Sequence, residues 1–257
     1  MSAQAADTTK TRGRVRIEQG AKRVRVYLGG EVVADTIRPT LVWEKPYYPA
    51  YYFPLEDVRT ELLEADGGSV HSPSRGDATT YTVRAGSREA QAAALRYEDS
   101  PIEELRELVR FDWDAMDAWF EEDEEVFTHP RDPYTRVDIL PSSRHVRVEV
   151  DGETIAESTS PRLLFETGLP VRYYLPKTHV RMELLEHTDT ESHCPYKGQA
   201  EWWSVRVGDE LHEDLAWSYR TPLPESQKVA GLIAFYNEKV DIYVDGVLQE
   251  RPRSKFS

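Results

Sequence analysis

The sequence contains a single cysteine, Cys194, in 257 residues. One thiol forms neither an intrachain disulfide nor a thiolate-rich metal site, so neither is expected to stabilise the fold. No stretch approaches the ~18 consecutive apolar residues of a membrane-spanning helix, and the polar N-terminal segment lacks the apolar core of a secretory signal. We therefore predict a cytoplasmic protein with no membrane partner, in which residues 1–13 form a flexible tail.

Positive charge is also scarce, with 32 Lys and Arg against 46 Asp and Glu and a net charge of −14. Nucleic acids are bound through clustered Lys and Arg, so a nucleic-acid partner is not expected. The sequence has no glycine-rich phosphate loop after a strand and no nucleophile elbow, so the common nucleotide and hydrolase signatures are absent and no cofactor is predicted. The acidic run at 121–125 is expected to be exposed to solvent.

An internal repeat organises the chain. A constant shift of 122 residues superposes 24–97 on 146–219 without a gap, with 27 identities in 74 positions. After Tyr97 the shift becomes 124, with Phe111 on Phe235 and Asp117 on Asp241. A gapless register over this length indicates a tandem duplication. We predict two domains, at 14–128 and 129–257, each of a common size for one hydrophobic core.

The dominant period within each copy is two, which is typical of strands. Charged and apolar residues alternate over 23–28 and over 147–150, and the dipeptides at 29–30 and 151–152 suit a two-residue hairpin turn. One short helix per copy is expected, over 101–108 and 224–230, because proline and glutamate stand near the start. The predicted fold class is mainly β, with two tandem, duplicated domains of antiparallel strands that each carry one short helix.

The most distinctive string is HCPYKG at 193–198. His193 beside Cys194 suggests a thiolate nucleophile, with Lys197 near enough to stabilise the negative charge. Neighbours in an extended segment point to opposite faces, however, and the first copy has Ser72 in place of the thiol while it keeps His71. Cys194 is therefore either catalytic, or a small structural residue or part of a pocket wall. No metal site is predicted, because one thiol and scattered histidines do not converge on a tetrahedral set.

A second group of polar and aromatic residues is retained in both copies. Apolar walls with a few oriented charges are typical of pockets for polar small molecules. The alternative is that the charged residues form solvated ion pairs and that the tyrosines belong to the core. The candidate ligand-binding residues are Glu44, Tyr52, Arg59, His71, Glu166, Tyr174, Arg181, His193, Cys194, Lys197, Trp217 and Tyr219.

In these segments the sequence resembles the bacterial domain-of-unknown-function 427 family in its tandem form. The resemblance is carried by YYLP at 173–176, VRM at 180–182, HCPYKG at 193–198, AWSY at 216–219 and IAFY at 233–236. It implies a β-tent type fold, with two sheets pinned at one edge, an architecture shared with domains that bind small ligands or proteins through an aromatic pocket. The first copy departs from the family pattern at Ser72, Ser74, Arg75 and Leu95.

Our first hypothesis is a binding module for a small polar or anionic ligand, with a pocket in each domain that is better formed in the second. Arg181 and Lys197 would bind the anionic group between aromatic walls. The alternative is an enzyme acting on a polar or phosphorylated metabolite, nucleotidyltransferase-like, with Cys194 or His193 at its site. A third hypothesis is a protein that binds a partner protein through its acidic surface.

Overall fold

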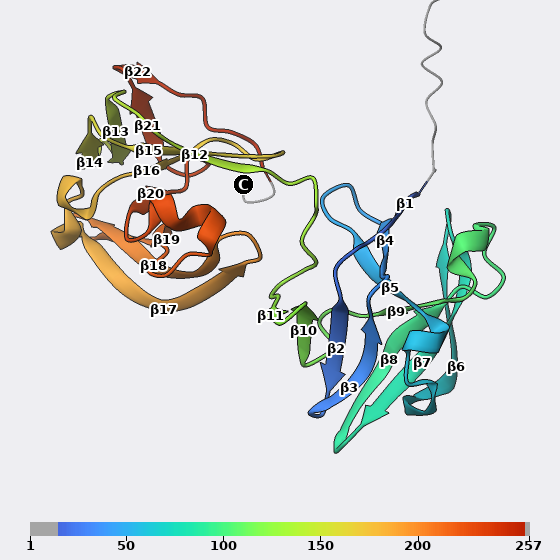
Figure 1. Cartoon of the computed structure of the whole chain (residues 1–257). Coiled ribbons are helices and arrows are strands. Elements are labelled where there is room, and N and C mark those ends of the chain that lie inside the picture. The colour runs from blue at the N-terminus through green and yellow to red at the C-terminus, as the bar shows by residue number, and fades with distance from the viewer. Residues whose placement is uncertain (1–14, 255–257) are drawn as a thin grey trace, which may run out of the picture. The chain divides into compact units, whose positions relative to one another are not determined.

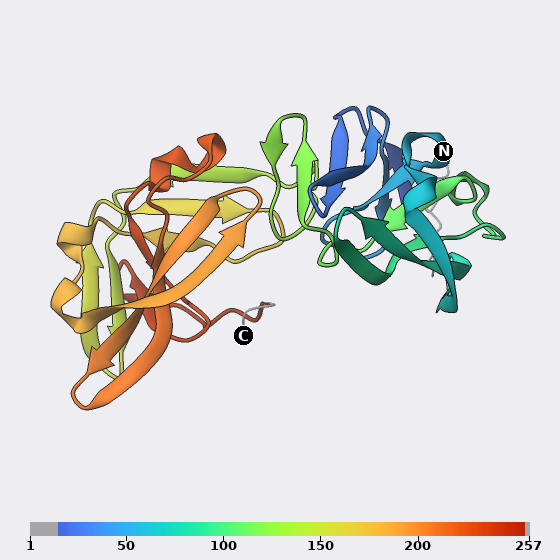
Figure 2. The same cartoon turned by 90° about the horizontal axis from the view of Figure 1, so that it is seen from below.

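The computed structural model describes residues 15–254, so the predicted tail at 1–13 lies outside the described residues. The chain divides into two compact units between Pro130 and Arg131, close to the joint expected from the repeat. Both units consist almost entirely of strands and turns (Figure 1, Figure 2). No helix among the described residues is long and apolar enough to cross a membrane.

The first unit contains two antiparallel sheets. The larger has the strand order β1-β4-β5-β9-β8-β7-β6, and the smaller has the order β11-β10-β2-β3. The strands are β1 (Arg16–Gln19), β2 (Val24–Leu28), β3 (Glu31–Thr36), β4 (Thr40–Trp43), β5 (Ala50–Pro54), β6 (Leu63–Ser72), β7 (Gly76–Ala85), β8 (Arg88–Arg96), β9 (Leu108–Phe111), β10 (Ala118–Glu121) and β11 (Glu124–Glu125).

The second unit repeats this arrangement with one difference. The counterpart of the seven-stranded sheet is divided into β12-β15-β16 and β17-β18-β19-β20, which meet at an isolated bridge between Leu175 and Ile233, and the smaller sheet is β14-β13-β21-β22. The strands are β12 (Val137–Pro141), β13 (Val146–Val150), β14 (Glu153–Ser158), β15 (Arg162–Glu166), β16 (Arg172–Tyr174), β17 (Leu185–Cys194), β18 (Gly198–Val207), β19 (Glu210–Ser218), β20 (Ile233–Phe235), β21 (Asp241–Val244) and β22 (Val247–Leu248).

The two copies share irregularities as well as strands. The β6–β7 ladder shifts register between Ala65 and Ser69, and the β17–β18 ladder shifts at the equivalent place, between His187 and Glu191. A bulge bends its strand and strengthens the local twist. The long strands of the two copies therefore have equal lengths and a bulge at the equivalent place, as their gapless sequence alignment implies.

Alternation along the strands places the core. Val24, Val26 and Leu28 of β2 are almost completely buried, whereas the residues between them are partly exposed. In β5 the alternate residues Tyr51 and Phe53 belong to one core cluster, and Tyr52 belongs to a second one. Because successive strand residues point to opposite faces, the first unit has a core on both faces of its larger sheet, and in the second unit the neighbours Trp202 and Trp203 of β18 likewise belong to two clusters.

The expected short helices are present only as 3-10 turns. The segment 101–108 contains η3 (Glu103–Leu105), and 224–230 contains η6 (Pro224–Val229). Further 3-10 turns are η1 (Leu55–Asp57), η2 (Thr60–Leu62), η4 (Lys177–His179) and η5 (Met182–Leu184). Segments this short form too few α-helical hydrogen bonds to offset nucleation, so the tighter turn results. The prediction of a mainly β, duplicated fold is confirmed.

Candidate functional site

Six predicted site residues of the second unit meet on the face of β16 and β17–β19 that is turned away from the smaller sheet. Glu166 ends β15, Cys194 ends β17, and Lys197 lies in the turn that follows. We call this group the Lys197 cluster: Glu166, Tyr174, Cys194, Lys197, Trp217 and Tyr219.

A buried ion pair lies at the centre of the Lys197 cluster. Lys197 Nζ donates a hydrogen bond to Glu166 Oε2 at 2.5 Å, and the two side chains are only 10% and 8% exposed. Burial opposes the positive charge, but electrostatic attraction to Cys194 and Glu166 outweighs it and raises the pKa of Lys197 above its ordinary value. The ammonium is therefore held in its charged form inside the protein.

Aromatic side chains surround this pair. Tyr174 is completely buried, and its hydroxyl accepts a hydrogen bond of 3.1 Å from Trp217 Nε1. Burial raises the pKa of Tyr174 to about 12, although Lys197 and the Trp217 donor partly offset it. Tyr219 is also buried, which raises its pKa well above the ordinary value. Cys194 is partly buried and is a free thiol.

The first unit has a related group of residues with a different set of hydrogen bonds and ion pairs. We call it the Arg75 cluster: Glu44, Tyr52, Arg75, Tyr97 and Arg110. Tyr52 donates to Glu44 at 2.6 Å, and Arg75 Nε donates to the Tyr97 hydroxyl at 3.2 Å. Arg75 and Arg110 both lie near the Glu44 carboxylate, at 3.8 and 3.6 Å. Two cations thus surround the Glu44 carboxylate in the first unit, whereas in the second unit Glu166 is paired with Lys197 alone among the described residues.

Other predicted site residues lie elsewhere. Arg181 is about half exposed and is paired with Glu153 and Glu183. Arg59 makes the equivalent pairs, at 2.8 Å to Glu31 and 2.9 Å to Glu61. These contacts are the solvated ion pairs that the sequence left open as the alternative.

The two predicted histidines are exposed. His71 Nδ1 lies 2.6 Å from Asp77 Oδ1, and His193 occupies the equivalent surface position in β17. Because His193 and Cys194 are consecutive in a strand, their side chains point to opposite faces.

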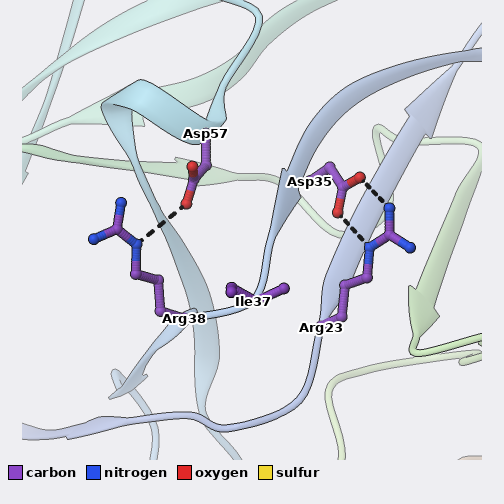
Figure 3. Close-up of a pocket in the computed structure, with 5 residues that line it drawn as sticks. All are labelled: Arg23, Asp35, Ile37, Arg38 and Asp57. Atoms are coloured by element: carbon purple, nitrogen blue, oxygen red, sulfur yellow. Dashed lines mark hydrogen bonds and ion pairs between the residues drawn. The ribbon is translucent and has the colours of Figure 1, made fainter.

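A hollow of about 680 Å³ opens in the surface of the first unit, away from both clusters. Figure 3 shows Ile37 at its centre, between the ion pair of Arg23 with Asp35 and that of Arg38 with Asp57. The hydrogen bond from Arg23 lowers the pKa of Asp35. Since each arginine already has a carboxylate partner, the hollow offers no unbalanced charge to a ligand.

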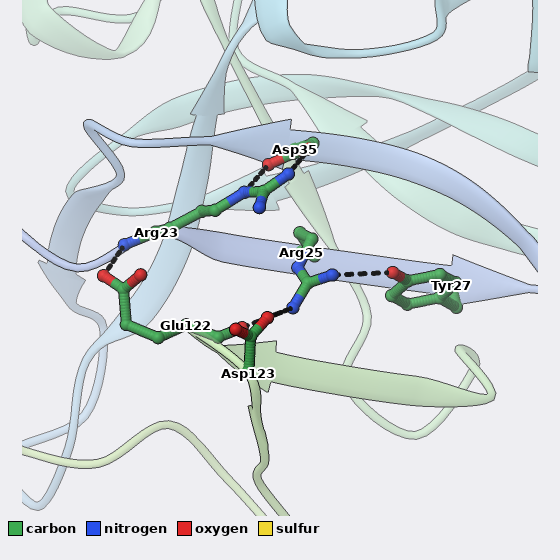
Figure 4. A network of polar contacts seen from close by, with 6 residues as sticks. All are labelled: Arg23, Arg25, Tyr27, Asp35, Glu122 and Asp123. Atoms are coloured by element: carbon green, nitrogen blue, oxygen red, sulfur yellow. Dashed lines mark hydrogen bonds and ion pairs between the residues drawn. The ribbon is translucent and has the colours of Figure 1, made fainter.

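The acidic run at 121–125 is only partly solvated, which corrects the expectation from composition. Arg25 donates to Asp123 Oδ1 at 2.8 Å and to the Tyr27 hydroxyl at 3.2 Å, and Figure 4 shows how these side chains lie. Glu121 is 3% exposed and accepts hydrogen bonds from Lys22, at 2.6 Å, and from Tyr51. The β10–β11 hairpin turns the Glu121 carboxylate toward the protein interior. The number of acidic residues in the run does not predict which of them is buried.

The sequence also did not single out a second buried ion pair, between Arg172 and Glu238. The guanidinium donates to both carboxylate oxygens, at 2.5 and 2.7 Å, and to Asn237 Oδ1 at 2.5 Å. Burial alone would raise the pKa of Glu238, but the hydrogen bonds from Arg172 and Ser254 lower it. Arg172 replaces Ala50 of the first copy, so a comparison of the copies marks the position as changed without showing its partner.

The fold and the two clusters define the class of protein: a tandem antiparallel β-domain protein that places a cation and a carboxylate beside two buried tyrosines in each copy. A family model described as "Domain of unknown function (DUF427)" matches residues 16–122 and 138–246. The two matched segments cover well over half of the chain, so the chain belongs to this family, as the resemblance predicted. A search of curated proteins gave no match.

Proposed function

We propose that the second unit binds a small polar ligand through an anionic group at the Lys197 cluster. One observation carries this proposal: the ammonium of Lys197 is almost fully buried, and among the described residues its Nζ donates only to Glu166. An ammonium has three N–H donors, and buried donors are normally used. Two donors are therefore left for a carboxylate or phosphate oxygen that enters beside Cys194.

The energetics of burial support a binding role for this pair. Removing two charges from water is costly, and a buried ion pair is often no more stabilising than well-packed apolar residues of the same volume. The second copy nevertheless buries a cation with a carboxylate, and the first copy places the partly buried Arg75 and Glu44 beside the equivalent buried tyrosines. Perturbed ionisable groups beside aromatic walls are typical of binding sites for polar molecules.

Calorimetric titration of the full chain with inorganic phosphate, malonate and adenosine monophosphate tests the proposal. We expect at least one probe to bind, and Lys197→Met to weaken it by about 1.5–3 kcal/mol, the usual range for a hydrogen bond to a charged group. Lys197→Arg introduces the cation that the first copy has at Arg75, and this variant should retain binding. Arg181→Ala is the matched control, because that cation lies in exposed ion pairs. Binding that survives Lys197→Met but is lost in Arg181→Ala would contradict the assignment.

A second candidate function is thiol chemistry at Cys194. It is favoured by the electrostatic interaction of Lys197 with Cys194, since a nearby cation stabilises the nucleophilic thiolate. Cys194→Ser introduces the residue present at position 72 of the first copy. The binding module retains its ligand in this variant, whereas an enzyme that uses the thiol loses turnover. We place the protein in the cytoplasm, where a partly exposed free thiol stays reduced.

A further inference from the structure

We propose that the second unit binds one divalent transition-metal ion between two hairpin tips, through Asp151, Glu210 and His212. One possible ligand atom of each residue lies within 4.8 Å of the others. The three residues share no member with the Lys197 cluster, so the two sites are independent proposals.

The hairpins of the fold bring these residues together. Asp151 lies in the turn between β13 and β14 with φ of 50°, the left-handed conformation of a primed two-residue turn. Glu210 and His212 are two residues apart at the start of β19, where they pair with Val207 and Val205 of β18. Residues two apart in a strand share a face, so the carboxylate and the imidazole point the same way.

The imidazole nitrogen nearest to Asp151 faces that carboxylate as an ion pair but makes no hydrogen bond within the described part of the chain. His212 Nε2 is shielded from solvent and lies 2.8 Å from Asp151 Oδ2, yet among the described residues it has no hydrogen-bond partner. Two neighbouring ligand atoms that bind the same ion at ~2.0–2.2 Å stand about 3 Å apart in octahedral and about 3.4 Å apart in tetrahedral geometry, so the two atoms need to separate by only a few tenths of an ångström to hold one ion. The separation of 2.8 Å is thus close to that of two ligands of one ion, while the orientation does not suit a hydrogen bond between them.

The donor set indicates which ions fit. One imidazole and two carboxylates suit zinc, manganese, cobalt or nickel, whereas calcium and magnesium prefer oxygen ligands alone. The two carboxylates also balance the charge of a divalent cation. Asp151 and Glu210 are exposed, so the ion would complete its coordination with water.

The first copy provides a natural comparison, because it has Gly29, Arg88 and Ala90 at the equivalent positions. There the hairpin tips are in close contact: a Cβ at Gly29 would lie 2.2 Å from the carbonyl oxygen of Ala85, and one at Gly86 would lie 2.6 Å from that of Gly29. A Cβ at Gly208, the counterpart of Gly86, meets nothing within 4 Å. The tips of the second copy therefore leave space where those of the first are closed.

The test is a titration of the full chain, stripped with chelator, with zinc and manganese chloride by calorimetry. We expect one ion per chain, and a loss of affinity of about tenfold or more in Asp151→Gly and in His212→Ala. Both variants introduce residues of the first copy, and the left-handed turn accepts glycine at 151. Circular dichroism checks that each variant is folded.

His145→Ala is the matched control. His145 Nε2 lies 2.7 Å from Glu157 Oε1, an exposed histidine–carboxylate pair outside the proposed site, so its loss should leave the affinity unchanged. Visible absorption of the cobalt-loaded chain gives a second readout, which should report a nitrogen ligand that disappears in His212→Ala. The proposal is overturned if no saturable binding occurs, or if His212→Ala and His145→Ala bind metal equally well.

Discussion

Single residues decide how the Lys197 cluster responds to substitution. Lys197→Met leaves the Glu166 carboxylate buried without its partner, which costs about 3–5 kcal/mol of unfolding free energy. The double variant Lys197→Met with Glu166→Leu removes both charges and should recover most of that loss. Urea unfolding of Lys197→Met, Glu166→Leu and the double variant against the parent chain measures the coupling between the two side chains. Equal destabilisation by the single and double variants would show that the charge pair is not the cause.

Alkaline pH should weaken the second unit through the same cluster. Burial raises the pKa of Tyr174 to about 12 from an ordinary value of 10.0, and the pKa of Lys197 is raised as well. A group with a raised folded-state pKa contributes stability that is complete below its unfolded pKa and is lost as the pH rises through the folded value. We therefore expect the free energy of unfolding to fall between about pH 10 and pH 12.

Urea unfolding at a series of alkaline pH values checks this dependence. Tyr174→Phe removes one of the groups whose pKa is raised, so its stability should decline less steeply with pH than that of the parent chain. Tyr243→Phe, in β21 of the smaller sheet, is the control and should retain the parent slope. A Tyr174→Phe chain with the parent slope would refute the assignment of the titration to Tyr174.

The sequence could predict much of the cluster at this scale, but not its partners. The repeat register marked Glu166, Tyr174 and Tyr219, because each recurs in the first copy. The same register aligns Arg75 with Lys197, but the prediction from the sequence includes only Lys197 as a site residue and misses Arg75. Arg110 could not be found in this way, since its counterpart in the second copy is Ala234 and only the β5–β9 pairing brings it beside Tyr52.

At the scale of elements, the two glycines of the β2–β3 turn, Gly29 and Gly30, are required for different reasons. Gly29 has φ of 59°, and a Cβ there would lie 2.2 Å from a backbone carbonyl oxygen. Gly30 has φ of 79°, but a Cβ there would meet nothing within 4 Å. Gly29→Ala should therefore destabilise the first unit by about 2 kcal/mol or more, through both strain and overlap. Gly30→Ala should cost about 1–2 kcal/mol through strain alone.

Chemical denaturation of the two glycine variants measures this difference. The comparison is internal, because both positions belong to the β2–β3 turn. A smaller loss in Gly29→Ala than in Gly30→Ala would show that the hairpin tip moves away from Ala85 at little cost.

Strands were easier to predict than helices for a physical reason. Alternation over 23–28 and 147–150 reports directly which side chains face a core, and β2 and β13 follow it. Proline and glutamate at 101–108 and 224–230 mark where a helical turn begins, but they do not determine whether it continues. The division of the large sheet in the second unit was also beyond prediction, since it depends on how far the pairing of β16 with β20 extends.

The whole molecule consists of two units whose cores are separate. Every buried residue of two clusters, which include Leu28 and Tyr52, comes from the first unit, and those of the other two clusters, which include Leu175 and Tyr174, come from the second. A domain with its own hydrophobic core can fold alone. We therefore expect residues 131–257, expressed separately, to unfold cooperatively with a midpoint close to that of the second unit in the full chain.

Substitutions in the full chain test the same independence without truncation. Leu175→Ala and Leu28→Ala each empty a fully buried site, which costs about 2–5 kcal/mol in the unit concerned. Because the cores share no residue, each variant should lower the midpoint of its own unit and leave the other unchanged, and the losses should add in the double variant. Hydrogen exchange of backbone amides, assigned to each unit, measures both effects. Loss of protection in the first unit caused by Leu175→Ala would show that the duplicated domains fold as one cooperative body.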